Sequence, residues 1–216
     1  MLRHGRNAHI YLQGVDLSGD CNSIKSDSAQ DLADVTTFGT STTGTKAHTF
    51  YPGLGKDSGT IEALGNWNTT TGYDRFEALV QAVPASTAGM MICWGNSSGT
   101  PAVAAQEVQL SNHNTKTVVT DVNRISYEFS TSNGPFQDCI LLEQKKTVTA
   151  TGDGTSSDNT TSSLLGGAGY AQIFTVGSSG TLTLTMETSS TGAFAGEEAT
   201  TATFLAASSS EAQRIK

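Results

Sequence analysis

The chain has 216 residues, enough for one large domain or two small ones with a hydrophobic core. Only 15% of the residues are charged and Gly, Ser and Thr are abundant, which favours strands and turns over helices. The net charge of −8 argues against tight binding to nucleic acid, because phosphate recognition depends on lysine and arginine. An acidic surface suits plain solubility, and it equally suits a surface that a polyanion must pass without adhering.

The N-terminal part begins with a predicted strand at residues 8–13, which turns at 14–16. Residues 22–35 alternate small and polar positions and are expected to form a second, weakly patterned strand. A long loop is predicted over 36–59, because Thr, Gly and Ser dominate there and apolar anchors are few. Such a loop is usually functional or ordered by a partner, so its residues are candidates for a contact between subunits.

A strand is expected to resume at Ile61, and one convincing helix follows at 72–83. Thr71 and Asp74 have the spacing of a capping box, apolar residues follow at helical spacing, and Pro84 ends the segment. Further strands are predicted at 89–95, 104–110, 117–130 and 137–143, and the last two could pair as an antiparallel hairpin.

The composition changes after Lys146, and we place a domain boundary between 1–144 and 145–216. The second part is rich in Thr, Ser and Gly and is expected to be a small antiparallel β-sandwich. Its clearest strand is 181–187, where Leu and Met alternate with Thr as a half-buried strand requires. Other strands are expected around 147–151, 170–176 and 200–205. The last residues look like the start of a strand, so this part is either incomplete or pairs there with a neighbour.

The sequence contains none of the common catalytic or nucleotide-binding motifs, so we expect no enzyme, no cofactor and no metal. Its three cysteines stand far apart and are best explained as reduced, small hydrophobic residues. The N-terminal residues are not followed by an apolar run, and no stretch approaches the roughly 20 apolar residues of a membrane span. We therefore expect no signal peptide, no membrane insertion, and synthesis in a reducing cytoplasm.

Several blocks of the sequence, taken in order, resemble the major tail tube proteins of long-tailed bacteriophages. The run from Arg6 to Gly19 resembles their opening strand and turn, and the run from Asp34 to Gly39 resembles the entry into their long loop. Residues 51–61 are similar to that loop's return into a core strand, and residues 73–79 to the helix that follows. The match covers roughly residues 6–143, while the second part looks only generically like the outward β modules that some tail proteins append.

The resemblance implies a tail-tube-type β-sandwich with one flanking helix, which assembles as hexameric rings stacked into a hollow tube for DNA ejection. It implies a virion protein assembled in the host cytoplasm, whose partners are other copies, the tape measure, terminator and baseplate or distal tail proteins, and passing DNA. In the family the inner strands of neighbours join around the lumen and the long loop bridges rings. The implied loop contacts here are Thr36, Thr37, Phe38, Gly39, Phe50, Tyr51, Pro52, Gly53 and Leu54, and the candidate lumen acids are Asp20, Asp27, Asp31 and Glu62.

Two other classes stay open from the sequence. One is a different structural virion protein, such as a decoration, sheath-like or tail-terminator protein. The other is a carbohydrate-binding adhesin module built on the second part of the chain. In the first part, Trp67 and Trp94 could stack a sugar ring, although lone tryptophans in strands are usually core or interface residues.

Overall fold

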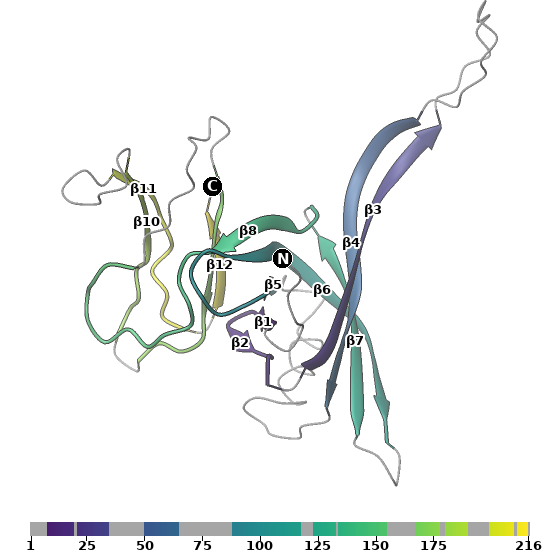
Figure 1. Cartoon of the computed structure of the whole chain (residues 1–216), viewed down its shortest axis with the longest axis horizontal. Helices are drawn as coiled ribbons and strands as arrows, with labels where there is room; N and C mark the ends of the chain where they lie inside the picture. Colours follow the sequence, from purple (N-terminus) through teal and green to yellow (C-terminus); the bar gives the residue numbers. More distant parts are fainter. Residues whose placement is uncertain are drawn as a thin grey trace, which may run out of the picture.

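The computed structural model of the chain shows an antiparallel β protein (Figure 1). It describes residues 8–19, 21–34, 50–64, 88–117, 123–132, 134–154, 167–177, 180–189, 199–209 and 211–215. The mainly β class predicted from composition is confirmed. The predicted helix at 72–83 lies outside the described residues.

Eight strands form one sheet in the order β2-β1-β5-β6-β7-β4-β3, with β8 paired to β6 beside this path. Every pairing in it is antiparallel, as expected of strands joined by consecutive turns. The strand bounds are β1 His9–Leu12, β2 Val15–Asp16, β3 Cys21–Asp34, β4 Phe50–Leu64, β5 Ala88–Cys93, β6 Thr100–Lys116, β7 Arg124–Ser132 and β8 Gln137–Leu141.

The hairpin predicted between the strands at 117–130 and 137–143 is wrong. Strands β7 and β8 do not pair with each other; each pairs with β6, β7 along Glu107–Lys116 and β8 along Thr100–Ala104. The pair Glu107–Ser132 is followed by the pair Ala104–Gln137. Between these two pairs, the segment that joins β7 to β8 has more residues than β6 has. Gly134, with φ +114°, and Pro135 lie in the extra length, and they interrupt a single line of pairing instead of reversing it.

The predicted loop at 36–59 is wrong over its last ten residues. Residues 50–59 belong to strand β4, and β3 and β4 pair from Cys21–Ala63 up to Asp34–Phe50. Composition misled here because Gly, Ser and Lys are poor strand formers by themselves, whereas the β3–β4 ribbon is stabilised by its ladder of backbone hydrogen bonds. Figure 1 shows the far end of this ribbon projecting away from the body of the molecule.

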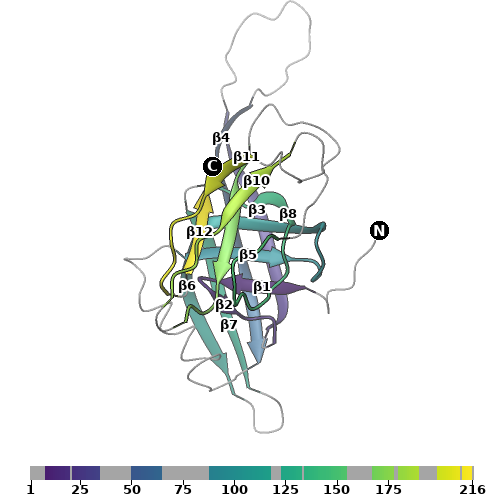
Figure 2. The ribbon, with the colours of Figure 1, turned by 90° about the vertical axis from the view of Figure 1, so that its left-hand side faces the viewer.

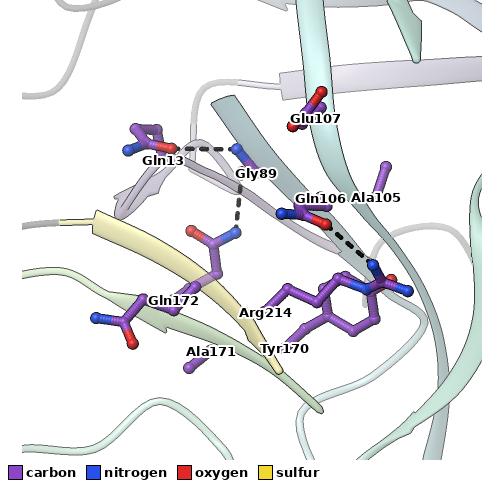
Figure 3. A pocket seen from close by; sticks show the side chains of 10 residues that line it. Gln13, Gly89, Ala105, Gln106, Glu107, Tyr170, Ala171, Gln172 and Arg214 are labelled. Atoms are coloured by element: carbon purple, nitrogen blue, oxygen red, sulfur yellow. Dashed lines mark hydrogen bonds between the residues drawn. The ribbon is translucent and has the colours of Figure 1, made fainter. Parts of the chain in front are cut away.

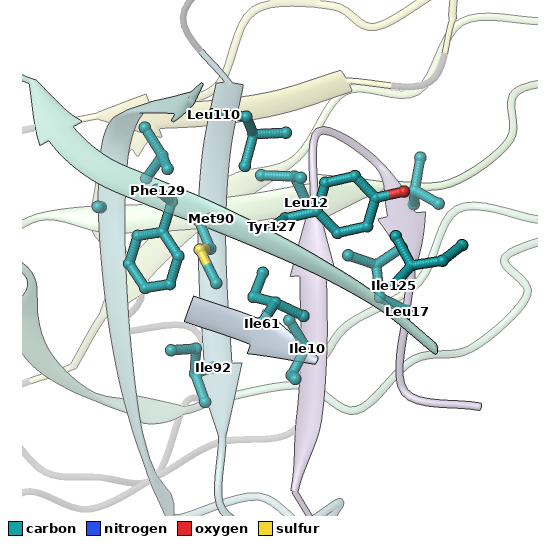
Figure 4. Packing of buried hydrophobic residues seen from close by; sticks show 13 residues of the cluster. Ile10, Leu12, Leu17, Ile61, Met90, Ile92, Leu110, Ile125, Tyr127 and Phe129 are labelled. Carbon is teal, nitrogen blue, oxygen red and sulfur yellow. The ribbon is translucent and has the colours of Figure 1, made fainter. Parts of the chain in front are cut away.

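One face of the sheet encloses the main hydrophobic core (Figure 4). Strand β7 shows why: its burial alternates residue by residue, with Ile125, Tyr127 and Phe129 no more than 2% exposed. Each such side chain contributes about 1.5–3 kcal/mol by its burial. The other buried members of this core are Ile10, Leu12, Val15, Leu17, Ile61, Met90, Ile92, Ala105, Val108 and Leu110.

The C-terminal part adds two strand pairs. Strand β9 (Gly169–Ile173) pairs with β12 (Glu211–Ile215), and β10 (Thr185–Thr188) pairs with β11 (Ala199–Thr203). The alternation predicted for 181–187 is confirmed, since Leu182, Leu184 and Met186 are half-buried and the threonines between them are exposed. The strand predicted at 147–151 is wrong: these residues belong to no described strand and are exposed.

Strands β9 and β12 lie against the opposite face of the large sheet (Figure 2). There a second cluster joins the buried Tyr11, Met91 and Cys93 of β1 and β5 to Tyr170 and Phe174 of the C-terminal part. The end of the chain therefore pairs within this molecule, with β9, and completes the cover of that face.

Candidate assembly surface

Four strands carry a polar face that looks away from the main core. In β3, β4, β7 and the lower half of β6, inward residues such as Ile61, Tyr127 and Leu110 are buried, and the residues between them are polar and largely exposed. Because side chains alternate along a strand, this polar face is continuous across all four. Its described members include Ser23, Lys25, Asp27, Ser58, Thr60, Glu62, Ser126, Glu128, Ser130, Gln109, Ser111 and Asn114.

Two of the four predicted lumen acids, Asp27 and Glu62, lie exposed on this polar face. Asp31 belongs to β3, and Asp20 lies outside the described residues. Cations share the surface: Lys25 Nζ lies 2.7 Å from Asp27 Oδ2, and the polar face as described also carries Lys56, Lys116 and Arg124. The charge of the polar face is therefore mixed, not purely acidic.

Two unpaired strand edges border the polar face. Strand β3 pairs only with β4, so no described strand pairs with its other edge. On β6, β5 stops at the Ala88–Val108 pair, which leaves residues 109–116 with β7 on one side and no described strand on the other. A row of unpaired N–H and C=O groups is a template for pairing with another chain.

The ribbon of β3 and β4 leaves the sheet at a well-packed point. Strand β4 pairs with β7 only from Ser58 onward, so residues 50–57 pair with β3 alone. The predicted contact residues Phe50, Tyr51, Pro52, Gly53 and Leu54 fall in this ribbon, and Thr36, Thr37, Phe38 and Gly39 lie outside the described residues.

Asp57 anchors the base of the ribbon. Its side chain is buried, at 4% exposed, and its Oδ2 accepts a hydrogen bond from the N–H of Phe136. Its own N–H donates to Oγ1 of Thr131, at 3.0 Å. Asp57 thus ties β4 to β7 and to the interruption before β8, a role that sequence reasoning missed because nothing marks a buried aspartate among polar neighbours.

A polar seam joins the C-terminal strands to the large sheet (Figure 3). The Gln172 amide donates to the carbonyl of Gly89, at 3.0 Å, and accepts from the N–H of Gly14, at 2.8 Å. Arg214 donates from Nη1 to Gln106 Oε1, at 3.0 Å, and its guanidinium lies 5.6 Å from the ring centroid of Tyr170. A cavity of about 140 Å³ remains between these groups. The seam's groups largely bind one another and the one aromatic face is occupied by Arg214, so the cavity offers no platform for a sugar ring.

Lys145 forms a second link across the same boundary. Its Nζ lies 2.6 Å from Asp16 Oδ2 and 4.8 Å from the ring centroid of Phe174, which in turn packs edge-on against Tyr11. Partial burial alone would raise the pKa of Asp16, but hydrogen bonds from Lys145 and Ser18 outweigh it and hold that pKa below its ordinary value. Burial is the main reason that the pKa of Tyr11 rises to about 12, with the charge of Asp16 adding to it.

Chemical groups suited to catalysis do not gather in the described part of the chain. No three His, Cys, Asp or Glu side chains there stand close enough to hold a metal ion. The three cysteines form no disulfide, and burial raises the pKa of Cys93 to about 12, with a smaller effect from Cys139, so this thiol stays protonated. Trp94 lies at the end of β5 and is 38% exposed; Trp67 is outside the described residues. No described helix has the length and apolarity to cross a membrane.

Comparison with solved structures finds chains to which this chain is similar. A chain of the PVC sheath-tube complex of an extracellular contractile injection system, in the extended state, aligns with a TM-score of 0.50 and 10% identity, over 65% of this chain and 93% of that one. The SPP1 tail tube aligns with 0.48 and 12% identity, over 65% and 80%. The virion of a native gene transfer agent particle aligns with 0.49 and 10%, over 64% and 99%.

At these identities the comparisons concern the fold alone, and only the first of the three alignments is close enough to carry an argument. It shows that about two thirds of this chain shares its fold with a chain of a sheath-tube assembly. No family model and no curated protein matches the sequence.

Proposed function

We propose that this chain is a structural, non-catalytic subunit of a phage-type tail tube, which assembles as stacked hexameric rings into a conduit for DNA. The observation that carries the proposal is the four-stranded polar face with an unpaired edge at each side, β3 at one and residues 109–116 of β6 at the other. The fold shared with a sheath-tube assembly supports it.

The directions of the strands suit the joining of these two edges. Successive antiparallel pairings make β3 run with β7 and against β6. If β3 of one copy lies beside β6 of the next, the joint is again antiparallel and the polar faces become one surface. The contact uses two different edges, so it repeats head to tail, and a rotation that closes yields a ring with no free edge.

The projecting ribbon is suited to contact a neighbouring ring. Its described end, at Asp34 and Phe50, lies beyond the pairing with β7, and residues 35–49 connect its two strands. We assign the contact between rings to Thr36–Gly39 and Phe50–Leu54, as the resemblance implies. We also propose that residues 1–144 form the tube domain and residues 145–216 an outward module. In the virion, the subunit would contact tape measure, terminator and baseplate proteins.

The polar face would line the lumen. Asp27 and Glu62 are exposed there, and Asp20 and Asp31 are assigned to it on sequence position. Lysines and acidic residues lie interspersed among serines and threonines on this face. Such a surface has no strong net attraction for phosphates, so DNA would move along it without being held.

Electron microscopy of the purified chain provides the first test, with rings or tubes as the expected result. A particle that stays monomeric at every salt concentration would contradict the proposal. Deleting residues 40–50 should abolish the stacking of rings while rings still form. Assembly that survives this deletion unchanged favours a decoration protein.

The joint itself can be tested by cysteine pairs across the two edges. Asp27→Cys in β3 combined with Ser111→Cys or Asn114→Cys in β6 should give a ladder of covalent oligomers on oxidation. Each single variant, which keeps Cys21, Cys93 and Cys139 in place, should give no ladder and serves as control. Oligomers that form equally from the single variants, or a chain that assembles with no ladder from any pair, would rule out this joint.

A further inference from the structure

The cavity in the polar seam lies at an irregularity of the large sheet (Figure 3). The register of β5 and β6 shifts between Ala88 and Met90, where β5 contributes Gly89 and β6 contributes two residues, Gln106 and Glu107. In a regular strand these two side chains would point to opposite faces, whereas a β-bulge re-aims one of them. Gln106 and Glu107 both line the cavity, so the bulge brings an amide and a carboxylate to one place.

The cavity wall around Gly89 is held by side chains. The N–H of Gly89 donates to Gln13 Oε1, at 3.1 Å, and its carbonyl accepts from the Gln172 amide, at 3.0 Å. Gln13 has φ +46° and opens the two-residue turn between β1 and β2, a position where Gly, Asn or Asp is usual because φ is positive. Glutamine is less favourable there, but its longer side chain reaches Gly89. The choice of residue in this turn is therefore explained by its contact in the cavity wall.

Arg214 supplies the positive charge of the cavity. Its Nη1 donates to Gln106 Oε1, at 3.0 Å, and its guanidinium lies over the ring of Tyr170. Its Nε is buried and has no hydrogen-bond partner among the described residues. A buried N–H without an acceptor is destabilising, and charge-assisted hydrogen bonds make a carboxylate the strongest acceptor for a guanidinium. The Nε of Arg214 is thus a donor suited to a carboxylate oxygen.

We infer that the cavity binds a small zwitterion, a molecule with a carboxylate and an ammonium group on a short carbon chain. The carboxylate would accept a hydrogen bond from Nε of Arg214, and the ammonium group would lie at Glu107. These are the two charged residues among the described ones that line the cavity. An ion with a single charge would be attracted by one of them and repelled by the other, whereas a zwitterion is attracted by both.

The size of the cavity suits such a molecule. A single water needs about 10–15 Å³ of accessible space. The cavity has about 140 Å³, which is room for a molecule of several heavy atoms. An amino acid with a short or absent side chain is of this size.

An NMR titration of the full, unassembled chain tests the site, with the backbone amide of Gly89 and the side-chain amide of Gln172 as reporters. The probes are glycine, β-alanine and γ-aminobutyrate, which hold their two charges at increasing separations. Acetate and ethylamine, which carry one charge each, are the comparison. We expect at least one zwitterion to bind about tenfold more tightly than either of these, since a hydrogen bond to a charged group contributes roughly that factor.

Glu107→Gln separates a zwitterion site from an anion site. This variant keeps the backbone pair with Ser132 and removes only the charge, so it should lower the affinity for the best zwitterion about tenfold without weakening the binding of acetate. Glu187→Gln, the same change at an exposed glutamate of the C-terminal part, should alter neither affinity. Arg214→Lys replaces the guanidinium by a single ammonium group and should weaken the binding of every probe that has a carboxylate.

The inference is overturned if no zwitterion shifts the reporter signals of the parent chain. It is overturned equally if acetate binds as tightly as the best zwitterion, or if Glu107→Gln and Glu187→Gln bind that zwitterion alike. All these measurements are made on single chains, so failure of tube assembly would not affect them.

Discussion

Gly59 lies in β4, between Ser26 of β3 and Phe129 of β7, with which it pairs. A Cβ at this position would stand 2.0 Å from the carbonyl oxygen of Lys25 and 2.6 Å from Cζ of Phe129. The first neighbour is backbone and the second is a buried ring, so neither yields readily. The glycine that sequence reasoning placed in a loop is thus required for strand packing.

We expect Gly59→Ala to lower the free energy of unfolding by about 3 kcal/mol, the upper range for overpacking. Gly55→Ala is the matched control, because its added Cβ would meet only Pro135, at 3.6 Å, and should change the free energy by less than about 1 kcal/mol. Urea unfolding of both variants measures the difference. Equal losses would mean that the close approach at Gly59 does not limit the packing.

Asp57 gives the second prediction for a single residue. Asp57→Ala leaves the N–H of Phe136 without its acceptor at a part-buried site, which should cost about 1–3 kcal/mol. Asp57→Asn keeps a carbonyl acceptor and should cost less, and Asp27→Ala, at an exposed site, should cost little. Urea midpoints order the three variants. If the Asn and Ala variants lose the same amount, the hydrogen bond to Phe136 is not what Asp57 contributes.

At the scale of strands, the sequence predicts those whose environment differs between their two faces. In β7 the buried Tyr127 and Phe129 alternate with exposed polar residues, and in 181–187 Leu and Met alternate with Thr, so both were found. Strands β3 and β4 escape this signal toward their far ends, where they pair only with each other, and the loop predicted at 36–59 includes residues 50–59 of β4.

Partners of strands are harder to predict than the strands themselves. The interruption at Gly134 and Pro135 has the composition of a hairpin turn, yet β6 is long enough to hold β7 and β8 one after the other. The seam residues Gln172 and Arg214 could not be found from sequence either, since the contacts join positions more than 80 residues apart. The two edges of the polar face likewise follow from pairing, which local patterns do not encode.

The contact between Lys145 and Asp16 predicts how the C-terminal part responds to pH. The pKa of Asp16 is lowered in the folded chain, so its contribution to stability is present above the unfolded pKa of about 4 and is lost as the pH falls through the lower, folded value. Lys145 is half-exposed, so we discount the pair to about 0.5–1 kcal/mol.

Lys145→Met retains the aliphatic stem over Phe174 and removes only the charge. Thermal or urea unfolding should show the parent more stable than this variant at pH 6, and the difference should shrink as the pH falls below about 4 and through the lowered, folded pKa of Asp16. Lys25→Met is the control, because its partner Asp27 is 61% exposed and the change should have little effect at either pH. A difference that stays constant with pH would show that Lys145 acts through packing alone.

In the whole molecule, the C-terminal strands cover the second face of the large sheet, and the main core forms without them. Strand β12 is the only described partner of β9, and its Arg214 reaches Gln106 of β6. Removing residues 211–216 should therefore loosen 169–177 and uncover the cluster around Tyr11 and Cys93, yet leave β4 and β7 intact, because their buried side chains belong to the main core.

Hydrogen exchange followed by mass spectrometry can locate this effect. In the truncated chain we expect exchange at 169–173 to become about 10–100 times faster, since these amides lose their ladder, and exchange at 58–64 and 124–132 to stay within about twofold. Removal of Lys216 alone is the control and should change neither segment. If exchange instead accelerates across all these strands together, the two cores unfold as one unit, and the C-terminal part is integral to the fold of the large sheet.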